Sequence, residues 1–577
     1  MNNSNESKVK NSILKNEYVQ AMIIMGISIF FVLVLMISVD SVMGTPVEEV
    51  TIVNNKAEKY YYEGRYDEAI AEYTEMQKED PWPTYLIKIA EIYSMRGEFE
   101  TSNGALKEAV IHRDSLISEN KEEYLEKDKE FMNDVVFTFF MNKEYQQAIT
   151  LGRDYLEEVG PYRELVETMF TIHVALGEEI LAEEMVTLYP VRENNASDLA
   201  KVAKMQMIIN DKTEGIATLK RAWDIDKNEV QVFDVITQIA SYDEKAILEE
   251  LLELVELNPN EDLYKLFIAK IYTAIPSKVV EAEGIINNIA VENTDNINYA
   301  IIKAQLYSET DREKEANKII DKIISDENYD YIGYHIMAWN LYKDAEYEEA
   351  FEYCKKSIIE KRDYADNYGF LIPEIMKNWG QTQAVESYYR TALSIEPFNQ
   401  AMMIKIADYY AFTTSQYEKA KEYYNIALAL NPNEDFIYYQ LGCLALIEED
   451  VDVALENLNK AIELNNGVGQ YYRTIGNVYL EQEQNDLAIN SYRSAYALDN
   501  EDVLALNNAG AYYISVEENL FRGFDNIEGA YEKMNEDIDQ ETKEMITENY
   551  NNAKKLLDDY NKDNGVELDI PDFHLFY

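Results

Sequence analysis

The sequence predicts an all-α protein in which one N-terminal transmembrane helix precedes a right-handed solenoid of helical hairpins and a C-terminal capping helix. Three observations support this fold class: small residues recur about every 34 residues, residues 21–39 form an uncharged apolar stretch, and proline (11) and glycine (21) are scarce in 577 residues. One core rarely supports so long a chain, whereas a repeat array grows by stacking units that contact only their neighbours.

The apolar stretch is long enough to cross a membrane. Its 19 residues, AMIIMGISIFFVLVLMISV, rise roughly 29 Å as a helix, close to the thickness of a hydrocarbon core. A cleavable signal peptide is the alternative, but its apolar region is usually only about 7–15 residues long. We therefore expect a cytoplasmic tail over 1–19, a transmembrane helix over 20–43 and a juxtamembrane linker over 44–51.

The charges beside this stretch predict its orientation. Lys8, Lys10 and Lys15 precede it, and no Lys or Arg lies between 40 and 55. Because flanking cations favour the cytoplasmic side, we expect the N-terminus in the cytoplasm and the repeats outside it, in a protein of the cell membrane.

The repeat is visible in two series of mostly small residues. One series, expected in the second helix of each unit, is spaced by 34, 34, 36, 34 and 34 residues: Ala316, Ala350, Ala384, Ala420, Ala454 and Ala488. The other, expected in the first helix, is Ala304, Ala338, Ile372, Ala407, Gly442, Gly476 and Gly510. Residues that recur in this way mark the points where paired helices approach closely. The pattern is regular over 298–534 and divergent over 52–297.

Residues 535–577 follow a different pattern. A polar amphipathic helix over 541–561 is expected to cap the solenoid, since terminal units need a solvated outer face. The final segment, GVELDIPDFHLFY, is unusually apolar. We expect it either to fold back on the last helices or to dock on a partner.

Short motifs give the repeat a family resemblance. Gly64-Arg65-Tyr66-Asp67-Glu68-Ala69, Gly97-Glu98-Phe99 and Glu346-Tyr347-Glu348-Glu349-Ala350 each combine a turn with the start of a second helix. The pattern resembles the tetratricopeptide repeat family, in a membrane-anchored bacterial form. The resemblance implies about 12–14 helical hairpins and a concave surface, formed by the first helices, that binds proteins or peptides.

The composition argues against several other functions. Lys+Arg total 52 and Asp+Glu total 108, so the net charge of −56 repels nucleic acid. Cys354 and Cys443 are too few for a disulfide framework. No phosphate-binding glycine loop, Gly-x-Ser-x-Gly elbow or His-Glu-x-x-His motif is present. We expect no enzyme activity, metal, cofactor or small-molecule substrate.

Candidate binding residues can be placed on the concave surface. They are His335, Trp339, Tyr342, Phe436, Tyr439, Arg473, Asn477 and Asn508. Exposed aromatic anchors suit the capture of an extended peptide or a helix; the alternative is that some of these side chains pack on neighbouring units. Arg473, Asn477 and Asn508 also resemble part of a clamp for a peptide carboxylate. Such a clamp needs further cations in the next unit, where Lys543 is the best candidate.

Two functions remain open from the sequence. The first is a non-catalytic, membrane-tethered scaffold whose groove gathers protein partners at the cell envelope. The second is a regulatory or assembly subunit of a membrane enzyme or transporter, for example in surface-polymer biosynthesis.

Overall fold

The computed structural model describes residues 52–119, 121–240, 244–290, 294–310, 312–535, 538–562 and 569–577. The chain divides into two units, 1–52 and 53–577, and the second contains all the helices described below. The predicted cytoplasmic tail, transmembrane helix and linker lie outside the described residues. Within the described ranges, no helix is both long enough and apolar enough to cross a membrane.

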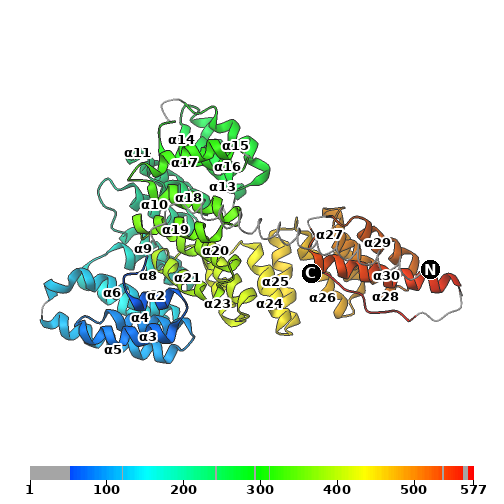
Figure 1. Cartoon of the computed structure of the whole chain (residues 1–577), viewed down its shortest axis with the longest axis horizontal. Coiled ribbons are helices and arrows are strands. Elements are labelled where there is room, and N and C mark those ends of the chain that lie inside the picture. The colour runs from blue at the N-terminus through cyan, green and yellow to red at the C-terminus, as the bar shows by residue number, and fades with distance from the viewer. Residues whose placement is uncertain are drawn as a thin grey trace, which may run out of the picture. The chain divides into compact units, whose positions relative to one another are not determined.

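The described part of the chain is all-helical, and successive helices pair as antiparallel hairpins (Figure 1). The divergent region forms hairpins too. Its pairs are α2 (Lys56–Tyr62) with α3 (Tyr66–Glu79), α4 (Thr84–Met95) with α5 (Phe99–Glu119), α6 (Lys121–Met141) with α7 (Tyr145–Val159), α8 (Arg163–Ala175) with α9 (Glu179–Leu188), α10 (Ala196–Ile208) with α11 (Lys212–Ile225), α12 (Gln231–Ala240) with α13 (Glu244–Leu257), and α14 (Asp262–Thr273) with η1 (Pro276–Lys278) and α15 (Val279–Ile286).

The regular region continues the same arrangement. Its pairs are α16 (Ile297–Ser308) with α17 (Glu313–Ile324), α18 (Asp330–Lys343) with α19 (Tyr347–Glu360), η3 (Asn367–Leu371) and α20 (Ile372–Asn378) with η4 (Thr382–Ala384) and α21 (Val385–Ile395), α22 (Gln400–Asp408) and η5 (Tyr409–Thr413) with α23 (Tyr417–Leu430), α24 (Asp435–Ile447) with α25 (Val451–Leu464), α26 (Gly469–Glu481) with α27 (Asn485–Leu498), and α28 (Val503–Ser515) with α29 (Leu520–Glu532). The described residues thus hold fourteen hairpins, followed by α30 (Gln540–Lys562), which packs on α28 and α29.

Most of the described hairpin turns are built in a similar way. The first helix ends two residues before a position with positive φ, as at Gly97 (φ 76°), Gly177 (φ 68°) and Glu483 (φ 57°). At Gly97 the backbone N–H donates to Ser94 O, and the next N–H, of Glu98, donates to Tyr93 O. These bonds satisfy carbonyl groups at the end of the helix and reverse the chain. The polar turns expected from the sequence therefore have a defined left-handed residue.

The small-residue series lie where the helices pack. The second-helix alanines, from Ala316 to Ala488, are all at most 5% exposed. At Gly442, Gly476 and Gly510 an added Cβ would come within 2.9 Å, 2.6 Å and 2.5 Å of a side chain of the paired helix. The 34-residue pattern therefore marks helix contacts, as the sequence predicted.

Contacts between hairpins far apart in sequence add a second level of structure. Helix α21 lies beside α2 (Figure 1). Ser387 Oγ donates to Tyr61 O at 2.6 Å, and the ring of Tyr388 lies 4.8 Å from that of Tyr62. Arg390 pairs with Glu91 on α4 at 3.5 Å and covers the ring of Phe137 on α6 at 4.8 Å. The concave side of the N-terminal hairpins is thus closed by α21, an arrangement that we call the closure.

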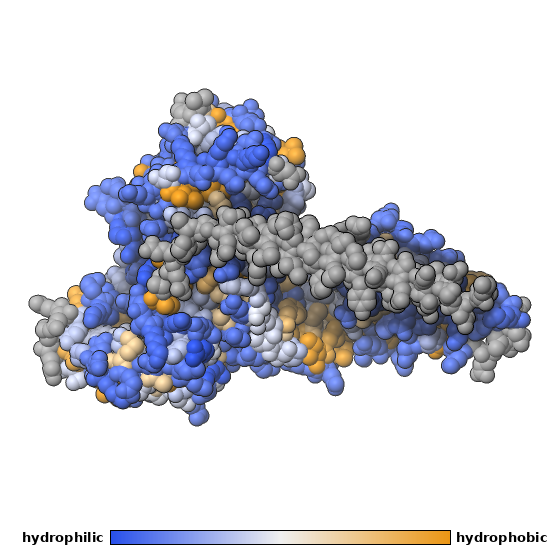
Figure 2. Space-filling view, in the orientation of Figure 1, coloured by the Kyte–Doolittle hydropathy of each residue, from blue (hydrophilic) through white to orange (hydrophobic). Residues whose placement is uncertain are grey.

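The visible surface is mostly hydrophilic (Figure 2). This agrees with the net charge of −56. Large exposed hydrophobic residues are scattered over many helices, for example Ile111 (71%), Ile180 (81%) and Val280 (79%). Isolated residues of this kind are normal on protein surfaces and indicate no binding site by themselves.

Candidate peptide-binding groove

Four asparagines line the groove formed by the first helices α26 and α28 together with α30. They are Asn477 on α26, Asn507 and Asn508 on α28, and Asn549 on α30. All four are at most 1% exposed. A buried amide is costly unless its donors and acceptor are bonded, so this row of side chains needs polar partners.

The main chain of residues 573–577, which we call the docked segment, supplies those partners. Asn508 Oδ1 accepts the N–H of Phe576 at 2.9 Å, while Asn508 Nδ2 donates to the carbonyl of Phe576 at 2.7 Å. Asn549 binds His574 in the same manner, with Oδ1 accepting the N–H and Nδ2 donating to the carbonyl at 2.9 Å and 2.8 Å. Asn477 donates to the carbonyl of Phe576 at 3.1 Å, and Asn507 to that of His574 at 2.8 Å.

This arrangement recognises an extended backbone. Residues two apart in an extended chain turn their N–H and C=O groups to the same edge, which is how neighbouring strands pair. Asn549 and Asn508 bind alternate residues, His574 and Phe576, and so act as a neighbouring strand would. The docked segment contributes only main-chain atoms to these bonds, so the bonds select a conformation of the segment rather than its sequence.

The asparagines also hold one another in place. Asn549 Nδ2 donates to Asn507 Oδ1 at 2.8 Å, and Asn508 Nδ2 donates to Asn477 Oδ1 at 3.2 Å. Tyr492 on α27 donates its hydroxyl to Asn477 Oδ1 at 2.8 Å. Side chains fixed in this way lose less conformational entropy when they bind a ligand.

Apolar side chains of the docked segment add sequence preference. Phe576 is 8% exposed and belongs to a cluster with Val503, Ala530 and Ile546. Phe573 packs against a neighbouring cluster that includes Ile527 on α29. The segment is therefore held by main-chain bonds and by two aromatic rings three residues apart.

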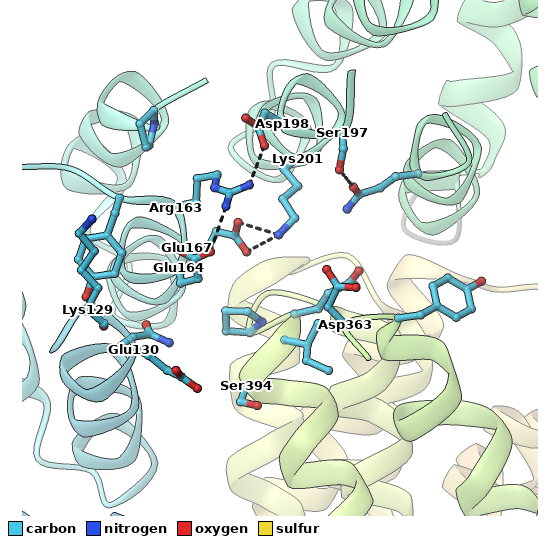
Figure 3. Close-up of a pocket in the computed structure, with 18 of the residues that line it drawn as sticks. Lys129, Glu130, Arg163, Glu164, Glu167, Ser197, Asp198, Lys201, Asp363 and Ser394 are labelled. Atoms are coloured by element: carbon cyan, nitrogen blue, oxygen red, sulfur yellow. Dashed lines mark hydrogen bonds and ion pairs between the residues drawn. The ribbon is translucent and has the colours of Figure 1, made fainter. Parts of the chain in front are cut away.

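A second hollow lies inside the closure. It is a cavity of about 910 Å³ between the first helices α6, α8, α10 and α12, the loop 361–364, and the end of α21 with the loop that follows it, residues 394–397 (Figure 3). On one wall Lys201 Nζ pairs with Glu167 at 2.8 Å and 3.0 Å, and Arg163 Nη1 with Asp198 at 3.3 Å; Asp363 lies on the facing wall.

Burial in this region raises the pKa of two further carboxyl groups. The pKa of Asp234 on α12 rises to about 6 and that of Asp366, just before η3, to about 8; the negative charge of Asp234 adds to the shift at Asp366. Glu396 adds to both shifts, while Lys270 opposes both. Asp234 lines the cavity, so the cavity wall combines paired charges with a carboxyl group that holds a proton more readily than usual.

The structure places the sequence-predicted aromatic residues differently from one another. His335 is 8% exposed, hydrogen-bonds through Nδ1 to Asn367 at 2.8 Å, and has its pKa lowered to about 4 by burial. Tyr439 is 5% exposed and stacks on Tyr471 with ring centroids 4.9 Å apart. Both are core residues rather than exposed anchors, because they fill space between adjacent first helices. The other three aromatic candidates are half-buried: Trp339, Tyr342 and Phe436.

The predicted carboxylate clamp has a different geometry. Arg473 pairs with Asp502, which also caps α28, so its guanidinium is already neutralised. Asn477 and Asn508 bind a peptide carbonyl, that of Phe576. Asn507 and Asn549 were not among the residues predicted from the sequence. The apolar composition of residues 565–577 was the available signal, because it indicated a segment that could fold back onto this surface.

The fold and the groove define the class: a repeat protein of stacked helical hairpins with a surface that holds an extended chain. A comparison with protein-family models identifies the type of repeat. Residues 401–434, 437–467 and 469–502, which span α22 to α27, match the family model of the tetratricopeptide repeat. The predicted resemblance is confirmed for these three repeats.

Comparison with whole proteins gives more distant similarities. No curated protein matches the sequence. Among solved structures, the APC/C hetero-tetramer Cut9–Hcn1 shares 13% identity over 86% of this chain and 95% of that chain, with a TM-score of 0.39. Yeast Tom70 shares 16% identity over 76% of this chain and 100% of that chain, with a TM-score of 0.38. Naa15/Naa10 bound to HypK-THB shares 12% identity over 87% of this chain and 96% of that chain, with a TM-score of 0.38.

Proposed function

We propose that this protein is a peptide-binding scaffold whose groove over α26, α28 and α30 holds extended segments of protein partners. The observation that supports this most directly is the docked segment, whose His574 and Phe576 are each bound at both main-chain polar groups by one asparagine. Paired hydrogen bonds to the backbone supply affinity, and the neighbouring apolar clusters supply preference for particular side chains.

A peptide selection tests the proposal. A random peptide library is selected against the chain shortened to residues 1–568, and the selected peptides are measured again with Asn508→Ala. Two hydrogen bonds are lost, so affinity should fall by ~1–3 kcal/mol, roughly 5- to 150-fold. Asn551→Ala, an exposed asparagine of α30, is the control and should change nothing. Selected peptides that ignore Asn508→Ala would place binding outside this groove.

We further propose that residues 20–43 anchor the scaffold in the cell membrane, with 1–19 in the cytoplasm and the groove outside. The uncharged stretch 21–39 and the lysines before it support this topology. Protease added to intact cells, or to protoplasts where a wall intervenes, should digest the repeats and spare residues 1–20. Full protection of the repeats, under conditions that degrade a known surface protein, would contradict the outward orientation.

A further inference from the structure

The groove is already filled by the protein's own chain. Both main-chain polar groups of His574 and of Phe576 are bound, and the four asparagines have their amides committed to the docked segment or to one another. The ring of Phe576 occupies the apolar cluster beside them. A second extended segment therefore cannot use these bonds until the docked segment leaves.

The docked segment also shows what an external segment must offer. The first and fourth positions, Phe573 and Phe576, place aromatic rings in apolar clusters. The second and fourth, His574 and Phe576, present an N–H to an asparagine, which a proline could not do. Tyr577 is 51% exposed, and its hydroxyl lies near Glu481 at the end of α26.

We propose that residues 573–577 are an internal ligand that competes with partner segments of the same chemistry. Such a segment is extended, has aromatic residues at its first and fourth positions, and has free N–H groups at its second and fourth. This inference rests on the proposed function, since it assigns a competitor to the same groove.

Tethering gives the internal ligand its advantage. Ten residues, 563–572, separate the end of α30 from Phe573. A short tether holds a ligand at an effective concentration on the order of 1 mM. If the docked segment itself binds the empty groove with a Kd of roughly 10 μM, a free peptide would bind the intact chain about 100-fold more weakly than the empty groove. Release of the docked segment would restore the full affinity.

The test uses a fluorescent peptide with the sequence of residues 569–577, DIPDFHLFY, and measures its Kd by anisotropy. Three proteins are compared: the full chain, the chain shortened to residues 1–568, and the full chain with Phe576→Ala, which keeps every helix. The peptide should bind the shortened chain at least tenfold more tightly than the full chain, and Phe576→Ala should fall between them. Asn508→Ala in the shortened chain should abolish the gain, whereas Asn551→Ala should preserve it.

Two modified peptides test the chemistry. A methyl group on the backbone nitrogen of Phe576 removes the N–H that Asn508 binds, and affinity for the shortened chain should drop at least tenfold. The matched control carries the methyl group on the nitrogen of Leu575, which binds none of the groove asparagines in the described structure, and should bind nearly as well as the parent peptide.

The outcomes separate the two proposals. Equal affinity for the full and shortened chains would overturn the internal ligand while leaving the groove as a binding site. Failure of the peptide to bind a shortened chain that still binds library-selected peptides through Asn508 would also overturn it. If neither kind of peptide depends on Asn508, the proposed function itself fails.

Discussion

At Gly476 the first helix of a hairpin approaches the second so closely that a methyl group has no room. An added Cβ would lie 2.6 Å and 2.8 Å from ring carbons of Tyr492, the residue whose hydroxyl orients Asn477. Gly104, on α5, has no atom within 4 Å of its Cβ position. The same substitution should therefore act in opposite directions at the two sites.

We predict that Gly476→Ala destabilises the protein by ~1–3 kcal/mol through overpacking. Gly104→Ala should stabilise it by about 0.5–1 kcal/mol, because alanine favours the helix where space is free. Chemical denaturation of both variants measures the difference. Equal effects would mean that the contact with Tyr492 adjusts without cost.

At the residue scale, the sequence predicts best the residues that belong to the repeat. Gly476 and the buried alanines follow from the 34-residue period, and Asn477 and Asn508 follow from the resemblance. Asn507 and Asn549 could not be found in this way, because their role depends on a segment 25 to 67 residues further along the chain. Tyr439 follows the alternative that the sequence left open, because its ring packs on Tyr471 of the neighbouring unit.

Between elements, the pair Asp234 and Asp366 predicts a dependence on pH. Burial raises the pKa of Asp366 to about 8, above the ordinary value of about 4 for the unfolded chain. The folded state then binds more protons than the unfolded state between these two pH values. The stabilising contribution is complete below pH ~4 and is lost as the pH rises through the raised pKa.

We predict that Asp366→Asn raises stability at pH 8.5 by ~1–3 kcal/mol and flattens the decline in stability between pH 5 and 8.5. Asp363→Asn, an exposed position in the same loop, is the control and should leave the pH profile unchanged. Thermal unfolding across this pH range measures both. A profile that stays the same in Asp366→Asn would show that another group causes it.

On the scale of the whole molecule, the closure joins hairpins that a simple solenoid would keep apart. The period predicts which residues face the paired helix and says nothing about contacts between the first hairpin and α21. At Gly64 the hairpin turn and the closure both require a glycine. Its φ is 70°, as the turn requires, and an added Cβ would lie 2.3 Å from the carbonyl oxygen of Gln383.

We predict that Gly64→Ala loosens the closure and Gly97→Ala does not. Both variants carry left-handed strain, of ~1–2 kcal/mol, but Gly97 has no atom within 4 Å of its Cβ position. Amide hydrogen exchange should therefore speed up in both α2 and α21 of Gly64→Ala, and only near the turn of Gly97→Ala. Faster exchange of α21 in both variants would contradict the prediction, because it would show that strain in the turn, and not contact with Gln383, causes the change.

The closure also sets an order of events during synthesis. Ser387 and Tyr61 are 326 residues apart. At ~5–20 residues per second, the ribosome needs roughly 15–65 s to make the intervening chain. During that interval the N-terminal hairpins have no α21 to cover them, and the ion pair between Glu91 and Arg390 cannot form. The nascent protein therefore presents an open, hydrated inner face to chaperones long after its first helices can form, and only the tenth hairpin shuts it.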